Sequence, residues 1–353
     1  MSSPNPTLTI ARPDDWHLHL RDGAELAAVV GYTARVFARA VVMPNLKPPV
    51  TTVAAAAAYR DRIRAALPAG GGFEPLMTLY LTDSTAPAEI DRAAESGFVV
   101  GVKLYPAGAT THSDAGVTSL ARCAAAIERM EARNLVLQVH GEAVGEDVDP
   151  YDRESVFIER ELAPLVARHP RLRVVLEHVT TRAGGEFVRA AGGRVAATLT
   201  PQHLLYNRGA MFRGGLRPHL YCLPVLKRER DREALVEAAT SNDPRFFLGT
   251  DSAPHARGAK ESACGCAGVY SAPAAIELYA RAFEEAGRLD RLEAFAGFRG
   301  ADFYGLPRNR GTITLEHRPW TVPASLPYGA GEIVPMCAGE TLEWKLRDAG
   351  GAP

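Results

Sequence analysis

The 353-residue sequence predicts an α/β fold, a (β/α)8 TIM barrel, on two observations. Eight short apolar segments recur along the chain, and they are near-continuous apolar runs, as expected of parallel strands buried on both faces. Amphipathic helical segments lie between them. Eight strands with intervening helices fit a barrel, which typically takes about 250 residues. An open, doubly wound sheet contains similar elements and is the alternative.

The expected strands follow one another at residues 16–21, 40–45, 75–81, 98–106, 135–142, 172–179, 194–200 and 245–251. The helical pattern is clearest at 119–134 and 155–170, where apolar residues recur at three- and four-residue steps and share one face. No Gly/Ser-rich or Pro-rich linker divides the chain. Residues 1–353 are therefore expected to form a single barrel domain with short N- and C-terminal extensions.

Composition argues against several classes of protein. Forty basic residues oppose 41 acidic ones, and a formal charge of −1 favours neither a nucleic-acid surface nor a polybasic membrane patch. No basic, apolar leader opens the sequence, and no apolar segment is long enough to cross a bilayer. The five cysteines are too scattered for a disulfide framework, so a cytoplasmic location is expected, and no role is assigned to Cys264 or Cys266.

Polar side chains close several of the expected strands, at the end of a barrel where active sites lie. These residues are His17, His19, Asn45, Lys103, His140, His178 and Asp251. A single histidine at a strand end is more often an ordinary hydrogen-bonded residue than a ligand. Four histidines and an aspartate at the ends of four strands favour a site for zinc or a similar divalent cation. Because residues two apart in a strand share a face, Arg21 should project beside the first two histidines.

Lys103 does not fit a cation site as an ammonium, which has no lone pair to donate. A neutral lysine amine can instead add CO2 to give a carbamate, an anionic oxygen ligand able to bridge two cations. Two divalent cations bring four positive charges; an aspartate, a carbamate and a hydroxide reduce the total to one, whereas an ammonium would leave three. Arginine could not serve, because it stays protonated in proteins. An ordinary structural ion pair of Lys103 is the alternative.

Six segments carry a resemblance to a known family. They read, in order, HLHLRDG, VVMPNLKPP, GVKLYPAGATTHSDAG, LQVHGE, LEHVTT and GTDSAPHARGAKESACGCAG. The chain resembles the class II dihydroorotases of the amidohydrolase superfamily from near residue 14 to beyond residue 268. His-x-His is shared with many amidohydrolases, but MPNLKPP and TDSAPHARGAKE are much more specific.

The resemblance implies two Zn²⁺ per subunit and a CO2-derived carbamate on Lys103 (N6-carboxylysine). It implies that His17, His19, Lys103 and Asp251 hold one zinc and that Lys103, His140 and His178 hold the second. It assigns the substrate carboxylate to Arg21, Asn45 and His255, contacts with the substrate ring to backbone atoms of Leu223 and Ala267, and the tip of a mobile loop to Thr110 and Thr111.

The implied reaction interconverts N-carbamoyl-L-aspartate and (S)-dihydroorotate, small-molecule substrates of pyrimidine (UMP) biosynthesis. A bridging hydroxide would attack the ring carbonyl, with Asp251 as general acid and base, and the resemblance also suggests a homodimer.

A hydantoinase- or allantoinase-like cyclic amidohydrolase is the nearest alternative. A non-catalytic barrel kept as a scaffold is the alternative from another class. Glu142 and Glu177 lie beside two of the histidines but receive no definite role.

Overall fold

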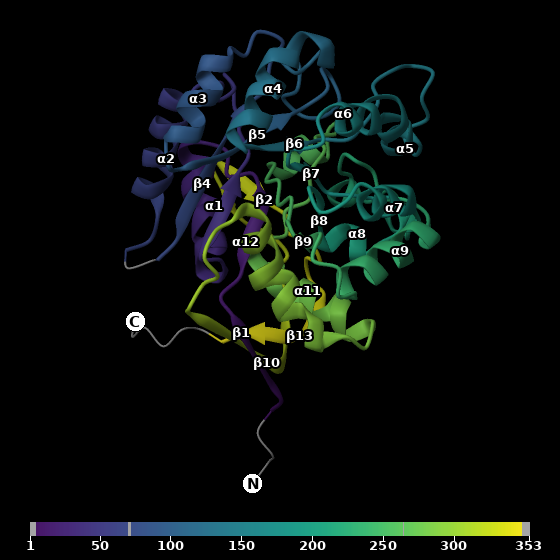
Figure 1. Ribbon diagram of the computed structural model, residues 1–353. Helices are drawn as coiled ribbons and strands as arrows, with labels where there is room; N and C mark the ends of the chain where they lie inside the picture. Colours follow the sequence, from purple (N-terminus) through teal and green to yellow (C-terminus); the bar gives the residue numbers. More distant parts are fainter. Residues whose placement is uncertain (1–4, 70–71, 264, 348–353) are drawn as a thin grey trace.

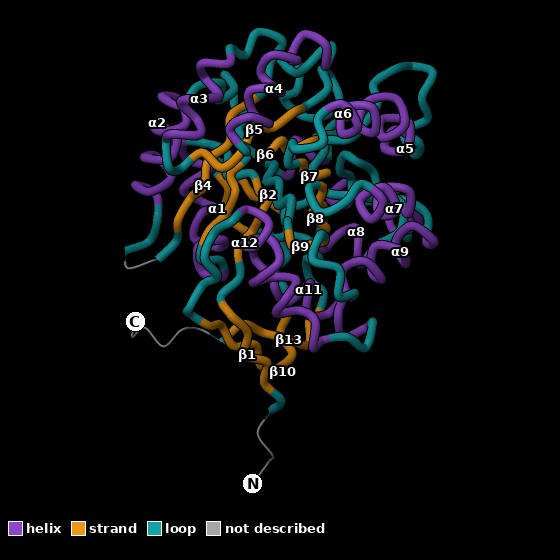
Figure 2. The backbone as a smooth tube through the Cα atoms, in the orientation of Figure 1, coloured by secondary structure: helices purple, strands orange, loops and turns teal. Residues whose placement is uncertain are grey.

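Eight parallel strands form the centre of the computed structural model, which describes residues 5–69, 72–263 and 265–347 (Figures 1 and 2). Their order in the sheet is their order in the chain. They are β2 (Asp14–Leu18), β3 (Arg39–Val42), β4 (Glu74–Tyr80), β5 (Val99–Leu104), β6 (Val136–Val139), β7 (Val174–Leu176), β8 (Val195–Leu199) and β9 (Phe246–Leu248). Each of the eight predicted strands overlaps one of them.

The sheet closes by bringing the segment after β9 against β2. The backbone N–H of Asp251 donates to the carbonyl of His17 at 2.8 Å, and that of His19 donates to Ser252 at 3.0 Å. The strand order shows no reversal, so the open doubly wound alternative is wrong and the barrel is confirmed.

The helices surround this sheet, as Figure 2 shows in purple around the orange strands. They are α1 (Gly23–Val36), α2 (Val53–Ala66), α3 (Pro87–Glu95), α4 (Ala124–Arg133), α5 (Arg153–Phe157), α6 (Ala163–Arg168), α7 (Arg182–Ala190), α8 (Pro201–Leu205), α9 (Glu229–Thr240), α10 (Arg257–Lys260), α11 (Ala275–Glu285) and α12 (Arg299–Tyr304). Several begin at a side-chain cap. Thr52, Thr181 and Thr200 each accept a hydrogen bond from the first turn of α2, α7 and α8.

Short 3₁₀ or π segments join or extend these helices. They are η1 (Leu120–Cys123), η2 (Ile158–Leu162), η3 (Arg208–Phe212), η4 (Pro218–Leu220), η5 (Ala272–Ala274), η6 (Leu289–Arg291) and η7 (Ala294–Phe298). The helix predicted at 119–134 is η1 followed by α4, and the one predicted at 155–170 is the continuous run of α5, η2 and α6. Both predictions are confirmed. None of the described helices is long and apolar enough to span a membrane.

The first strand differs from its prediction at both ends. It begins at Asp14, two residues earlier than expected, because two aspartates are buried there with partners: Asp14 pairs with Arg39, and Asp15 accepts hydrogen bonds from Thr250. It ends at Leu18, and Arg21 beyond it has a φ of 60°, which interrupts a regular strand.

The terminal extensions form a second, small sheet at the lower edge of Figure 1. In it β1 (Thr7–Ala11) pairs antiparallel with β10 (Thr312–Thr321), which pairs with β13 (Thr341–Leu346). A hairpin of β11 (Leu326–Tyr328) and β12 (Gly331–Ile333) lies between β10 and β13 in the chain. The sequence predicts the extensions but not their strands, and the single domain over residues 1–353 stays a prediction.

Aromatic side chains fill one end of the barrel interior. Trp16 stacks on Tyr304 of α12 with ring centroids 4.6 Å apart, and Phe247 meets Trp16 edge-on at 6.2 Å. The hydroxyl of Tyr304 accepts a hydrogen bond from Gln138 on β6. This packing leaves the polar site to the C-terminal ends of the strands, as expected for this fold.

Candidate active site

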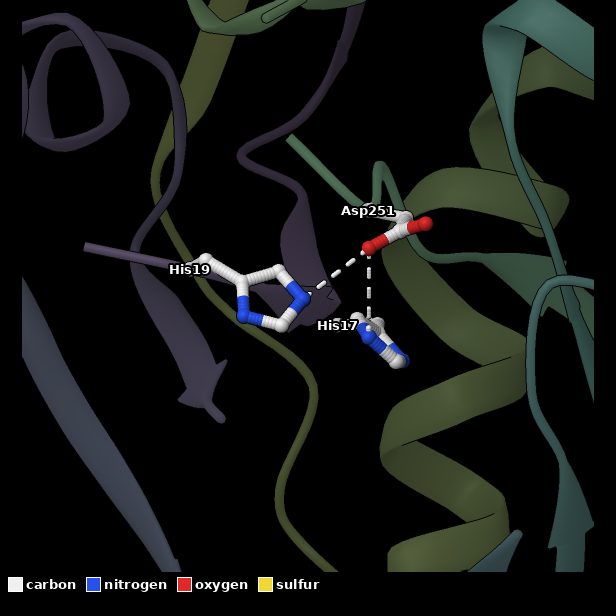
Figure 3. Close-up of side chains that lie close together, drawn as sticks. All are labelled: His17, His19 and Asp251. Carbon is white, nitrogen blue, oxygen red and sulfur yellow. Dashed lines mark hydrogen bonds and ion pairs between the residues drawn. The ribbon is translucent and has the colours of Figure 1, made fainter. Parts of the chain in front are cut away.

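Two histidines and an aspartate meet where the barrel closes (Figure 3). Oδ1 of Asp251 lies 3.4 Å from Nε2 of His17 and 3.1 Å from Nε2 of His19. Burial lowers the pKa of both imidazoles and raises that of the Asp251 carboxyl. Among the described residues, this trio could hold one metal ion.

Hydrogen bonds on the far side of each ring orient these two histidines. Nδ1 of His17 donates to Glu177 at 2.8 Å, and Nδ1 of His19 donates to Oδ1 of Asn45 at 2.8 Å. The amide nitrogen of Asn45 donates to the carbonyl of Thr111, so its oxygen must be the atom that faces His19. Each neutral ring therefore turns an Nε2 lone pair toward Asp251, which is how histidines ligate a metal.

A second pair of histidines lies beside the first. Nδ1 of His140 is 3.2 Å from Nε2 of His178, and Nε2 of His140 donates to Glu142 at 2.8 Å. The rings of His17 and His178 have centroids 5.1 Å apart, which joins the two groups into one cluster. Nδ1 of His178 is buried and has no hydrogen-bond partner.

Lys103 is fully buried, and its Nζ has no hydrogen-bond partner. Burial lowers its pKa to about 8, although the carboxylates of Glu177 and Asp251 act in the opposite direction. No ion pair of Lys103 occurs within the described ranges, so the structural ion pair considered above is not formed. A buried amine with a lowered pKa spends more time neutral, which is the form that adds CO2.

These side chains fit a site for divalent cations. The imidazole lone pairs and the Asp251 carboxylate oxygen are all acceptors, and they face one another at 3.1–3.4 Å in a buried place. Acceptors gathered in this way repel one another unless a cation lies among them. The orphaned amine of Lys103 is the one group that fits only after conversion to an anion.

A cavity of about 20 Å³ brings most of the predicted site residues together. Those lining it are His17, His19, Arg21, Asn45, Thr110, Thr111, His140, His178, Leu223, Asp251 and Ala267. The predicted residues absent from this lining are Lys103, which is buried, and His255, which contacts Arg21. Tyr105, Ala253 and Gly268 also line the cavity without having been predicted. Tyr105 could have been predicted from the sequence, because it lies two residues beyond Lys103 in the expected strand and so shares its face.

Arg21 has no carboxylate partner among the residues that the structure describes. Its Nε donates to the carbonyl of Pro254 at 3.0 Å, and its Nη2 donates to Nε2 of His255 at 2.9 Å. Asp14 and Asp22, acidic residues close to Arg21 in the sequence, pair instead with Arg39 and Arg62. The guanidinium therefore brings an uncompensated positive charge to the cavity wall.

The same contact fixes the hydrogen bonding of His255. A guanidinium can only donate, so Nε2 of His255 accepts from Arg21. Burial lowers the pKa of His255 to about 2, which keeps the ring neutral. The carbonyl of Ala267, 3.0 Å from the same nitrogen, then receives no proton from His255.

The segment 106–118 lies over the cavity. The carbonyl of Thr111 accepts from Asn45 at 3.1 Å, and the hydroxyl of Thr111 donates to the carbonyl of Ala267 at 3.4 Å. Two glycines lie in this segment. Gly108 has a φ of 78°, a conformation that favours glycine. Gly116 serves packing instead, because a Cβ there would lie 2.4 Å from the carbonyl of Tyr105.

Glu177 supports the histidines, although the sequence pattern gave it no definite role. Strict strand alternation would turn Glu177 away from the histidine face, but β7 ends at Leu176 and His178 has a φ of 40°. Both side chains consequently reach the interior. Thr198 connects them, donating from its hydroxyl to Glu177 and accepting from the backbone N–H of His178.

Cys264 lies outside the described residues, and Cys266 is a free cysteine.

The chain is similar in sequence and in structure to known dihydroorotases. The sequence profile of the Amidohydrolase family matches residues 7–336. A dihydroorotase of Laribacter hongkongensis is 68% identical over 341 residues, covering 96% of this chain and 99% of the relative. The crystal structure of a dihydroorotase from Campylobacter jejuni superposes with a TM-score of 0.90 at 34% identity, covering 98% of this chain and 99% of that one. A Saccharomyces cerevisiae dihydroorotase solved in complex with 5-fluoroorotic acid gives 0.89 at 32%, covering 97% and 98%.

Proposed function

The chain belongs to the amidohydrolase family, and we propose from this premise that it catalyses the reversible hydrolysis of (S)-dihydroorotate to N-carbamoyl-L-aspartate in pyrimidine biosynthesis. The observation that carries the proposal is the uncompensated Arg21 on the wall of the cavity that the His–Asp cluster also lines. The substrate is an acid whose ring amide must be cleaved. The site offers a receptor for the carboxylate beside a cluster suited to amide hydrolysis.

The finer composition of the metal centre is part of the proposal. Members of this family depend on metal, and we assign two Zn²⁺, the first to His17, His19, Asp251 and a carbamate on Lys103, the second to that carbamate, His140 and His178. When bound, such ions lower the pKa of a water molecule and polarise a carbonyl oxygen. The unpaired Nζ of Lys103 and the inward-facing lone pairs support this assignment.

Protein groups hold the substrate and move its proton. Arg21 offers a fork of N–H donors to the planar carboxylate. His255 contacts Arg21, and Asn45 lines the same cavity. Backbone atoms of Leu223 and Ala267 hold the ring. Asp251, whose Oδ1 lies beside both His17 and His19, is the carboxylate that takes the proton of the attacking water and delivers it to the leaving ring nitrogen.

The charge of Arg21 distinguishes dihydroorotate from the substrates of the alternative enzymes. A hydantoin or allantoin ring carries no carboxylate and would leave the buried guanidinium unpaired, at a cost in binding free energy. A scaffold that had lost catalysis would not be expected to keep all six ligand residues, which this chain does. The homodimer and the cytoplasmic location stay predictions.

The direct test is an assay of the purified protein on dihydroorotate and on an uncharged hydantoin, with metal counting and with or without chelator. We expect turnover of dihydroorotate that chelation abolishes and added Zn²⁺ restores. Preference for the hydantoin would favour the hydantoinase alternative. An inactive protein with no bound metal would favour the scaffold.

Lys in place of Arg21 tests the carboxylate receptor. A lysine keeps the charge but loses the fork, so Arg21→Lys should lower kcat/KM for dihydroorotate by about 10- to 100-fold. Turnover of an uncharged hydantoin, if measurable, should not fall. Arg62→Lys is the matched control, because Arg62 pairs with Asp22 on the surface. Equal losses on both substrates would contradict the assignment of Arg21.

Removal of two hydroxyls tests the loop. The cavity of about 20 Å³ has room for little more than a water molecule, so a six-membered ring enters only when the loop moves. The variant Thr110→Ala/Thr111→Ala should lower kcat/KM by about tenfold, because the closed loop then lacks two hydrogen-bonding groups over the substrate. Thr314→Ala in the terminal sheet is the control. An unchanged kcat/KM in the double variant would remove the loop from the mechanism.

A further inference from the structure

Lys260, the last residue of α10, makes an unusual set of contacts close to the cavity. Its side chain is buried, with 4% of the residue exposed, and its Nζ lies 2.7 Å from each of three backbone carbonyls. The carbonyls belong to Tyr221, Cys266 and Gly268. No carboxylate forms an ion pair with Lys260 within the described part of the chain.

Space filling does not explain a lysine at this position. Burying an ammonium costs free energy, and an apolar side chain of similar volume is often as stable or more so. An ammonium differs from the other side chains in offering three donors from a single atom, which can converge on three carbonyls. An arginine presents its donors in a planar fork and cannot reproduce that geometry. The feature that Lys260 supplies is thus the relative position of three main-chain groups.

These main-chain groups belong to the two segments assigned to the substrate ring. Tyr221 lies two residues before Leu223, and Cys266 and Gly268 flank Ala267. The segments also pair directly, since the N–H of Gly268 donates to the carbonyl of Tyr221 at 3.0 Å.

The main chain at 266–268 presents its carbonyls in two directions. Those of Cys266 and Gly268 face Lys260, whereas that of Ala267 between them faces His255 and Thr111. A shift in the contacts to Lys260 would therefore move the carbonyl of Ala267 at the cavity wall.

We propose that Lys260 is a positioning residue, which fixes the main chain of Leu223 and Ala267 so that both contact the substrate ring. The inference rests on the proposed function, because that function assigns these two residues to the ring. Lys260 itself does not line the cavity. Lys260 acts through the ring contacts, which are made both before and during the reaction. Its loss should therefore affect substrate binding more than the chemical step.

Lys260→Met tests the proposal, since methionine is unbranched and of similar length but donates no hydrogen bond. We expect KM for dihydroorotate to rise about tenfold while kcat stays within about threefold, the pattern of lost uniform binding. Metal content should equal that of the wild type. Hydrogen exchange of the metal-loaded protein should be faster at the amides of 221–223 and 266–268. Lys345→Met, in β13 of the terminal sheet, is the matched control and should change neither measurement.

Lys260→Arg keeps the proposal testable if the methionine variant does not fold. Arginine retains the charge without the three-way geometry, so KM should again rise, by about threefold or more. A wild-type KM together with wild-type exchange in either folded variant would overturn the inference. Failure of the wild type to hydrolyse dihydroorotate would instead refute the proposed function, while the exchange measurement would still decide whether Lys260 holds the two segments.

Discussion

Lys103→Arg is expected to abolish activity and to disrupt the metal centre. Arginine keeps a positive charge and stays protonated, so it can neither add CO2 nor ligate a cation. Its guanidinium would also repel the ions from the position where the carbamate is proposed. We expect kcat/KM for dihydroorotate to fall by more than about a thousandfold, because all the functions of the metal centre are lost at once.

The measurement is kcat/KM together with metal counting on the folded variant, which should retain at most one divalent ion per chain. Lys345→Arg controls for an added arginine and should keep the wild-type rate. Two bound ions and near wild-type turnover in Lys103→Arg would show that the amine at position 103 is not converted into a ligand.

Asp251→Asn is expected to have the second largest effect. Asparagine has nearly the shape of aspartate and keeps an oxygen beside His17 and His19, but it cannot take up the proton of the attacking water. General acid–base catalysis typically contributes about 10²- to 10⁴-fold, so kcat should fall within that range, with a smaller change in KM. Circular dichroism and metal counting should show a folded protein that still binds metal.

The comparison of kcat with metal content separates two roles of Asp251. A fall in activity that matches the loss of metal, and that added Zn²⁺ reverses, would make Asp251 a ligand without a part in proton transfer. A kcat within tenfold of the wild type at full metal content would contradict its assignment as general acid and base.

Much of the barrel could be predicted because its strands are buried on both faces and read as apolar runs. The predicted strand bounds are wrong where polar residues are buried with partners and where a strand ends. Asp14 and Asp15 extend β2 because each has its own polar partners, and φ at Arg21 is positive. The terminal sheet was missed because β10 is partly exposed along most of its length and carries no apolar run.

The polar residues at the strand ends predicted which side chains gather around the cavity. Some of these side chains, however, reach the cavity from a loop and not from a strand. His19 and Arg21 reach the cavity from the loop after β2 and not from a continuing strand. Glu177 received no definite role because strand alternation would turn it away from the histidines, and alternation fails where β7 ends. Lys260 had no signal in the pattern of side chains, since its partners are three backbone carbonyls brought together only by the fold.

The central claim is that the buried amine of Lys103 becomes an anionic ligand between two metal ions. The most direct test is ¹³C NMR of active, metal-counted enzyme equilibrated with ¹³C-bicarbonate, because a carbamate would not survive acid denaturation. We expect one carbamate carbon per chain, present in the wild type with two bound ions and absent from Lys103→Arg. A fully active wild type with two ions per chain and no carbamate signal would contradict the account.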